Sequence, residues 1–192
     1  MLAAVREGDA KKLAKLMRKD PGFNVNMDQN VPGGHTLLHY ACSEESRSAV
    51  IPLLLAHPDI DVNVKDITGG TPFYYACCGH ASCVREMLKD SRVKVNEPDK
   101  YGTTPLWHAA ANGHLEIIKW WIASEREIVL GRPGDVDKTD AIGIVQRKRK
   151  TEVVTLLERF KGDATQTRSE VKKELGYLGM VPGFVLVLTY LW

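Results

Sequence analysis

The chain has 192 residues, of which 44% are hydrophobic and 26% are charged, a composition that excludes an intrinsically disordered protein. A formal net charge of +2 does not favour nucleic acid or an anionic membrane as the main partner. The four cysteines lack zinc-ribbon spacing, no cationic-then-apolar leader is seen, and the apolar runs are shorter than the roughly twenty residues that span a bilayer. We therefore expect an intracellular, cytoplasmic protein without a membrane span.

Residues 2–17 predict two short helices that meet at Gly8. Leu13 and Leu16 recur on one face of the second helix, and no turn sequence precedes the first. We expect a helix pair with one apolar flank.

Three segments that share one sequence pattern follow. TLLHYAC begins at Thr36, TPFYYAC at Thr71 and TPLWHAA at Thr104, so they are spaced by 35 and 33 residues. Each is preceded by an asparagine that ends NVN, DVN or KVN: Asn26, Asn63 and Asn96. A period near 33 residues predicts structural units that stack against one another.

The third of these units shows the local signals best. Thr104 is predicted to be a helix N-cap, and Pro105 follows it at the first helical position. Gly113 supplies the left-handed residue that ends the helix. Asp99 and Gly102 bracket the tight turn that precedes it. The second helix carries an apolar stripe: Ile117, Ile118, Trp121 and Ile122. Neither helix reaches the roughly twelve residues at which an isolated helix becomes marginally stable, so each unit needs its neighbours.

A fifth unit, which matches the repeat pattern less closely, ends the array. TEVVTLLERF from Thr151 repeats the second helix, and its partner helix is predicted from about Asp140 to Lys148, after a longer turn that contains GRPGD. Arg149 occupies the glycine position, and QRKRK replaces the run of small residues, as expected of a cap exposed to water.

Beyond Gly162 the repeat ends. Residues 165–176 predict one more amphipathic helix, with Val171 and Leu175 facing inward. The apolar ending MVPGFVLVLTYLW needs cover, so we expect it to pack back over the last repeat, or to be covered by the remainder of a longer protein.

These segments resemble ankyrin repeats. The match is close for residues 96–123 and good for 63–89 and 26–56. The resemblance implies an all-α ankyrin-repeat solenoid, built from α-hairpins with β-turn fingers. It implies about five repeats, at 1–25, 26–60, 61–93, 94–127 and 128–161, followed by C-terminal capping helices in an extension at 162–192.

Some positions depart from the family pattern. The histidine four residues into Thr-Pro-Leu-His is present as His39, but Tyr74 and Trp107 replace it elsewhere, so a Thr–His link is expected in one unit only. Pro52 would disturb a helix interior, so we place that helix start near Ser48.

Catalytic or metal chemistry is not favoured by the sequence. One group of thiols and a histidine suggests zinc at first sight: Cys77, Cys78, His80 and Cys83. The paired ligand spacing of structural zinc sites is missing, however, and thiols at the small alanine position behave as compact apolar side chains. A Cys78–His114 dyad lacks any nucleophile signature, no phosphate loop occurs, and Glu44–Glu45 reads as solvated charge on a loop. We therefore expect no enzyme, no catalytic residue, no metal and no cofactor.

The resemblance implies that a partner protein binds the concave side, which is formed by the turn tips and the first helices. Residues four past the capping threonine form a row there, and turn residues extend it. Lys65 and Lys100 would suit an acidic segment of the partner. We call this surface the partner strip, and it comprises Tyr40, Ser43, Glu44, Lys65, Ile67, Tyr75, Lys100, Tyr101, His108 and Asn112.

The favoured function is therefore a monomeric scaffold or adaptor that holds another protein on the partner strip. The alternative is the regulatory or targeting part of a larger polypeptide, and a weaker alternative is nucleotide binding on the concave face. Residues 147–150, RKRK, are compatible with nuclear import or with a plain polar turn.

Overall fold

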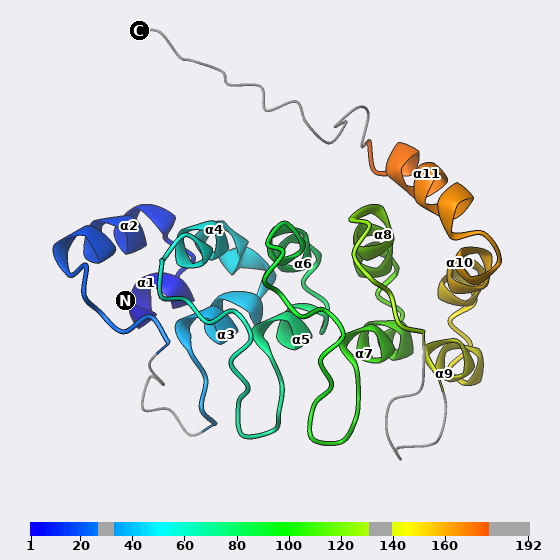
Figure 1. Ribbon diagram of the computed structural model, residues 1–192, viewed down its shortest axis with the longest axis horizontal. Coiled ribbons are helices and arrows are strands. Elements are labelled where there is room, and N and C mark those ends of the chain that lie inside the picture. Colours follow the sequence, from blue (N-terminus) through cyan, green and yellow to red (C-terminus); the bar gives the residue numbers. More distant parts are fainter. Residues whose placement is uncertain (27–32, 131–139, 177–192) are drawn as a thin grey trace, which may run out of the picture.

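The computed structural model describes residues 1–26, 33–130 and 140–176, in which helices follow one another and no strand occurs. Figure 1 shows the helices in two rows. The first helices of the pairs are α1 (Leu2–Arg6), α3 (Leu37–Cys42), α5 (Pro72–Ala76), α7 (Pro105–Asn112) and α9 (Ala141–Arg147). The second helices are α2 (Ala10–Lys19), α4 (Ile51–Leu55), α6 (Ala81–Leu88), α8 (Leu115–Ala123) and α10 (Thr151–Gly162).

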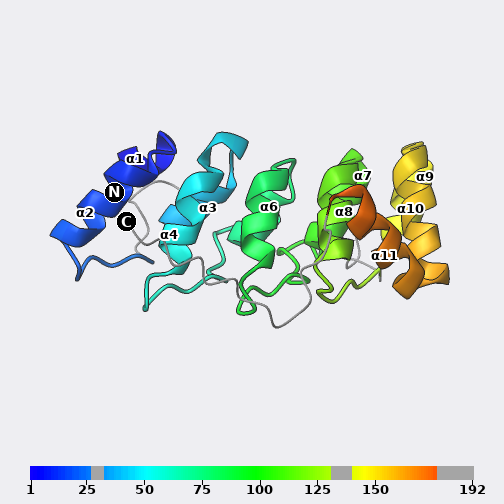
Figure 2. The same cartoon turned by 90° about the horizontal axis from the view of Figure 1, so that it is seen from above.

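The helix pairs lie side by side in a single row, which we call the file, as the view from above shows (Figure 2). The fingers hang below the row of first helices (Figure 1). This arrangement confirms the predicted all-α solenoid of stacked helix pairs.

Threonine caps start the first helices as the sequence predicts. Thr104 Oγ1 accepts a 3.2 Å hydrogen bond from the backbone N–H of Trp107, and Thr71 makes the same bond one unit earlier. At Thr36 the histidine takes part, because His39 Nδ1 accepts from the Thr36 N–H at 3.1 Å. The other ring nitrogen, Nε2, lies 3.2 Å from the carbonyl oxygen of Gly70 in the next unit. The predicted Thr–His link is confirmed, and it also joins two units.

A single core runs through the file. Trp121 of α8 is fully buried, and its ring meets Phe73 of α5 edge to face at 5.0 Å between centroids. Trp120 is half-buried and lies beneath the Arg85 guanidinium, 5.4 Å from the ring centroid. The prediction that Trp121 belongs to the core is therefore confirmed.

The repeated asparagines bond each unit to the next one. Asn63 Nδ2 donates to the Arg92 carbonyl at 2.9 Å, and Asn63 Oδ1 accepts from the Lys94 N–H at 2.8 Å. Asn26 makes the same pair of bonds one unit earlier. Asn96 makes only the donor bond, at 3.4 Å, and its buried Oδ1 has no partner among the described residues.

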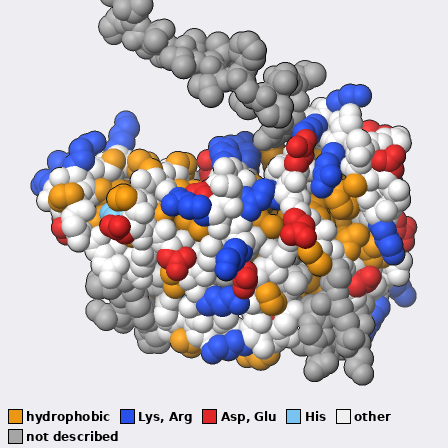
Figure 3. Space-filling model, in the orientation of Figure 1, with side chains coloured by type: hydrophobic (Ala, Val, Ile, Leu, Met, Phe, Trp, Pro, Cys, Tyr) orange, Lys and Arg blue, Asp and Glu red, His pale blue; other side chains and the backbone are white. Residues whose placement is uncertain are grey.

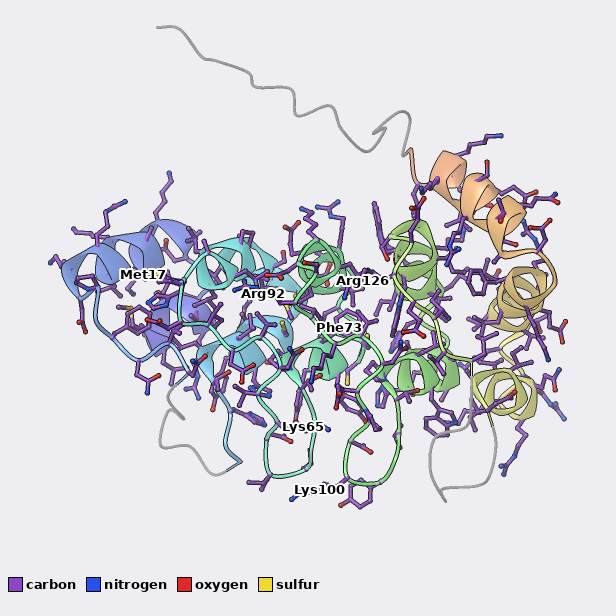
Figure 4. The ribbon with its side chains drawn as sticks, viewed as in Figure 1. Met17, Lys65, Phe73, Arg92, Lys100 and Arg126 are labelled. Carbon is purple, nitrogen blue, oxygen red and sulfur yellow. The ribbon has the colours of Figure 1, made fainter. Side chains whose placement is uncertain are left out.

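Two arginines form a second series of hydrogen bonds between units, and both are labelled between the two rows of helices in Figure 4. Arg92 donates to the Leu55 carbonyl at 2.7 Å, and Arg126 donates to the Asp90 carbonyl at 2.8 Å. Each bond reaches back to the preceding unit. The asparagines and the arginines thus tie neighbouring units together through the loops that follow the second helices.

The second unit differs from expectation around Pro52. We expected the helix to start near Ser48, but a 3-10 helix, η1 (Glu45–Val50), comes first and α4 starts only at Ile51. Pro52 still lies in the first turn of α4, where its missing N–H removes no helical hydrogen bond. Glu45 is not simply solvated charge on a loop, because its carboxylate accepts from the Ser82 N–H at 3.0 Å.

The worn end units keep the turn geometry of the clear ones. Gly8 and Gly113 have φ values of 66° and 76°, and Arg149 has φ 55°, which confirms that Arg149 stands in the glycine position. Asp140 caps α9 through a 2.7 Å hydrogen bond from the Gly143 N–H.

Beyond the five pairs, helix α11 (Ala164–Glu174) folds back onto α10 and α8. Val171 is buried, and Glu174 forms an ion pair with Lys119 of α8 at 2.6 Å. The apolar ending and the turn with GRPGD lie outside the described residues. The boundary between an array at 1–161 and an extension at 162–192 stays a prediction.

Candidate functional site

An aspartate closes each of the two fingers that the structure describes in full, at residues 64–70 and 97–103. Asp66 Oδ1 accepts hydrogen bonds from the N–H groups of Thr68 and Gly70, both at 2.8 Å. Asp99 repeats the arrangement in the next finger, with distances of 2.9 and 2.8 Å. The aspartate thus satisfies the amides that a tight turn would otherwise expose.

Backbone hydrogen bonds also tie successive fingers to one another. The Ile67 N–H donates to the Gly33 carbonyl at 3.0 Å, and the Lys100 N–H donates to the Thr68 carbonyl at 2.9 Å. The labelled Lys65 and Lys100 mark two neighbouring fingers in Figure 4. The fingers therefore form one continuous edge.

The finger tips present apolar side chains to solvent. Ile67 is 64% exposed and Tyr101 is 66% exposed. Hydrophobic and basic side chains alternate along the lower edge of the molecule, where the fingers end (Figure 3). Large side chains held open in this way are suited to contact with a partner.

Five rings join the first helices α3, α5 and α7 into a surface that we call the aromatic ridge. In order along the file they are Tyr40, His35, Tyr75, Tyr74 and His108. Successive ring centroids lie 5.7, 5.2, 6.1 and 5.3 Å apart, within the range of aromatic contact. The row expected at the position four past each threonine is thus brought together, and two further rings bridge its members.

The middle of the ridge is fixed by a carboxylate. The Tyr75 hydroxyl donates to Asp66 Oδ2 at 2.6 Å, and His35 Nε2 lies 3.2 Å from both groups. Burial would raise the pKa of Asp66, but hydrogen bonds from Tyr75, Thr68 and Gly70 outweigh burial and lower this pKa to about 2. Burial and the Asp66 carboxylate raise the pKa of Tyr75 to about 12. The hydroxyl is therefore occupied inside the chain, and only the Tyr75 ring is offered outward.

The two ends of the ridge have local partners as well. The Arg6 guanidinium lies over the Tyr40 ring, 5.0 Å from its centroid. At the other end, Asn112 Nδ2 donates to the His108 carbonyl at 2.9 Å.

Lys65 is already paired within the chain. Its ammonium lies 2.9 Å from the Glu97 carboxylate and donates to the Pro98 carbonyl at 3.1 Å. The hydrogen bond from Lys65 to the Glu97 carboxylate and the positive charge of Lys65 lower the pKa of Glu97. Lys65 therefore serves the junction between fingers, whereas Lys100 is exposed at its tip.

Ser43 and Glu44 hold the turn that follows α3. Ser43 Oγ donates to the Tyr40 carbonyl at 3.1 Å, and Glu44 forms an ion pair with Arg47 at 2.5 Å. Both residues therefore stabilise this turn at the margin of the partner strip.

Sequence reasoning did not assign His35 and Tyr74 to the strip. Tyr74 replaces the family's histidine, and His35 directly precedes the capping Thr36. The sequence shows an aromatic residue at each of these positions, but the direction in which its side chain points depends on how neighbouring units stack.

The Cys78 thiol lies near a histidine but is not activated. Cys78 Sγ lies 4.0 Å from His108 Nε2, but burial raises the pKa of Cys78 to about 11. The thiol is therefore protonated at neutral pH and a poor nucleophile. Across the described residues, no group of three or more His, Cys, Asp or Glu side chains could hold a metal ion. Within the same ranges, no helix is long and apolar enough to cross a membrane.

Comparison with known proteins gives relatives of much greater length. The chain is 41% identical over 101 residues to the SMC5-SMC6 complex localization factor protein 1 of Bos taurus and 37% identical over 126 residues to that of Homo sapiens. It is 29% identical over 107 residues to Rabankyrin-5 of Mus musculus. These alignments cover 50%, 56% and 55% of the chain, but only 9%, 11% and 9% of the relatives. The chain therefore spans about a tenth of their length.

The family model for ankyrin repeats (3 copies) matches residues 1–99 and 50–140, well over half of the chain. The matched residues include the second, third and fourth pairs, with their capped first helices and their second helices. The chain belongs to the ankyrin-repeat family.

Proposed function

We propose that the chain is a scaffold or adaptor that binds a partner protein on the partner strip. Ankyrin repeats are in general protein–protein interaction modules. The observation that carries the proposal is the aromatic ridge, which continues without a gap across three successive units and is flanked by exposed finger tips.

The physical argument concerns ordering. Rings that already touch one another lose little conformational freedom when a partner covers them, so the ordering cost of binding is low. Aromatic side chains also dominate the centres of protein interfaces. The Asp66 carboxylate and the bonds between fingers hold this surface in place before binding.

The test compares affinity capture from the native source by the wild-type chain and by two variants. Ile67→Ser/Tyr101→Ser removes two exposed tips and should keep the fold, because neither side chain belongs to the core. Arg85→Ser/Lys89→Ser changes an exposed residue of α6 and its exposed C-cap and serves as the control. We expect the first variant to weaken binding of the captured partner at least about tenfold, or about 1.4 kcal/mol. An equal loss in both variants, with both folded, would reject the partner strip.

A targeting role within a larger polypeptide is the second candidate. The first relatives are named as localization factors of the SMC5-SMC6 complex and are about ten times longer than the region aligned. We propose that the array places an associated protein or domain, in which case a nuclear position agrees with the exposed residues 147–150. Imaging of the tagged chain tests this point: exclusion from the nucleus, unchanged when the four basic residues are neutralised, would argue against it.

A further inference from the structure

The turn between the first and second helix of each pair recurs five times, and we call these the inner turns. The first two contain acidic residues that are held within the chain. Glu7 pairs with Lys12 at 2.7 Å and Glu44 with Arg47 at 2.5 Å, while Asp9 accepts from the Lys12 N–H and Glu45 from the Ser82 N–H. The third and fourth turns carry histidines and no acidic residue between their helices. The inner turns therefore lose negative charge along the file.

The fifth inner turn is basic throughout. Lys148, Arg149 and Lys150 are all exposed, and none of them forms an ion pair with another described residue. Basic side chains project at the edge of the molecule beyond α9 in Figure 3. The inner turns thus change along the file from acidic residues to histidines and then to cations.

The backbone of this turn is firmly held. The Lys150 N–H donates to the Val145 carbonyl at 3.0 Å, and the Arg149 N–H donates to the Gln146 carbonyl at 3.1 Å. The Lys150 stem packs over Gly113 of the fourth inner turn, where an added Cβ would lie 2.9 Å from Lys150 Cδ. The aliphatic stem is therefore ordered while the ammonium faces solvent.

The fourth inner turn shows the positive surroundings. Burial lowers the pKa of His114, and His80 and Lys150 lower it further, against a hydrogen bond to the Cys78 carbonyl that raises it. The Lys150 ammonium of the fifth turn therefore lies close enough to disfavour a proton on His114, so the positive charge here is carried by the fifth turn.

We propose, on the basis of the function proposed above, that an acidic segment of the partner protein binds at the fourth and fifth inner turns, with its carboxylates on Lys148, Arg149 and Lys150. The site continues the aromatic ridge, because Asn112, which bonds to His108, is the last residue of α7, and α7 packs against α9. The partner thus lies with its apolar part on the ridge and its acidic part toward α10. Lys65 has no part in this recognition because Glu97 already neutralises it.

A short acidic peptide fits this place better than a nucleic acid. Glu116 and Glu152 are exposed in the first turns of α8 and α10, the second helices of the fourth and fifth pairs. A continuous phosphate backbone would run against these carboxylates, whereas a few aligned side chains can avoid them.

The test uses a fluorescein-labelled peptide in which glutamate alternates with serine, and its glutamine counterpart, with fluorescence anisotropy at physiological salt. The variant Lys148→Gln/Arg149→Gly/Lys150→Met removes three charges, gives the left-handed position a glycine and keeps an unbranched stem over Gly113. The matched control Lys11→Gln/Lys15→Gln/Lys19→Gln removes three exposed charges from α2. Circular dichroism and thermal unfolding establish that both variants are folded.

We expect the glutamate peptide to bind about tenfold more weakly to the turn variant, and within about twofold of wild type to the α2 control. Equal weakening in both variants, or no binding to wild type, would overturn the proposal. Tighter binding of duplex DNA, lost in the same turn variant, would overturn it in favour of a nucleic acid. If the partner captured from the native source needs Ile67 and Tyr101 but tolerates the turn variant, the acidic segment is wrong and the proposed function stands.

Discussion

The hydroxyl of Tyr75 donates a 2.6 Å hydrogen bond to Asp66 Oδ2, so that the centre of the aromatic ridge is fastened to the finger that precedes it. One carboxylate thereby closes the finger with one oxygen and orients a helix side chain with the other. The shape of the partner strip thus depends on a bond that no partner makes.

Tyr75→Phe tests this fastening. The ring remains, but Asp66 loses its shortest hydrogen bond, so we expect the free energy of unfolding in urea to fall by about 1–2 kcal/mol. Tyr101→Phe, at an exposed tip, is the control and should change the free energy by less than about 0.5 kcal/mol. Equal effects of the two substitutions would show that the Asp66 contact contributes nothing.

Acid should destabilise the protein through His39. Burial lowers the pKa of His39 to about 4, against the opposing hydrogen bond to the Gly70 carbonyl, and the neighbouring His35 lowers it further. An unfolded histidine titrates near pH ~6.5, so between these values the unfolded chain binds a proton that folded His39 does not. The contribution is present above pH ~6.5 and is lost as the pH falls toward 4, by about 3 kcal/mol.

Unfolding at pH 7 and pH 5 measures this loss. His39→Gln should show a smaller difference between the two conditions than wild type, since His108 and His114 titrate in both proteins. An NMR titration that placed the His39 pKa near that of an unfolded histidine would contradict the account.

Gly69→Ala should break the junction between fingers. Gly69 has φ +83°, and an added Cβ would lie 2.7 Å from the Lys100 amide nitrogen, whose N–H bonds the Thr68 carbonyl. Gly176 also has a positive φ, +70°, but open space around it, so Gly176→Ala isolates the backbone term of about 1 kcal/mol. We expect Gly69→Ala to cost at least about 2 kcal/mol by urea denaturation, because the clash adds to that term. Similar costs for both would show that the fingers do not press together.

The adjacent tryptophans of α8 should behave differently. Trp121→Ala removes a fully buried ring that packs on Phe73, and we expect a loss of about 3–5 kcal/mol in the free energy of unfolding. Trp120→Ala removes a half-buried ring that contacts Arg85 and should cost about 1 kcal/mol. Chemical denaturation of both variants measures the difference, and a reversed order would place the core on the wrong face of α8.

The features that the sequence predicted correctly are local. A threonine before proline starts a helix, and a position that requires a left-handed backbone can be recognised even where Arg149 fills it, because the period identifies it. The apolar stripe of α8 follows in the same way from helical periodicity.

Features that depend on how units sit beside one another were not predicted. The Lys65–Glu97 pair and the Tyr75–Asp66 bond join residues whose distance is set by the stacking of fingers. The 3-10 helix before Pro52 likewise reflects packing of the second unit against its neighbours. The return of α11 onto α8 depends on the direction in which the chain leaves α10.

Hydrogen-exchange mass spectrometry of the chain with and without its captured partner tests most directly whether the partner covers the ridge and the fingers. The account predicts slower exchange in the fingers around Ile67 and Tyr101 and in α5 and α7, with no change in α4 and α6. Slower exchange confined to the second helices of the pairs, such as α4 and α6, would contradict it.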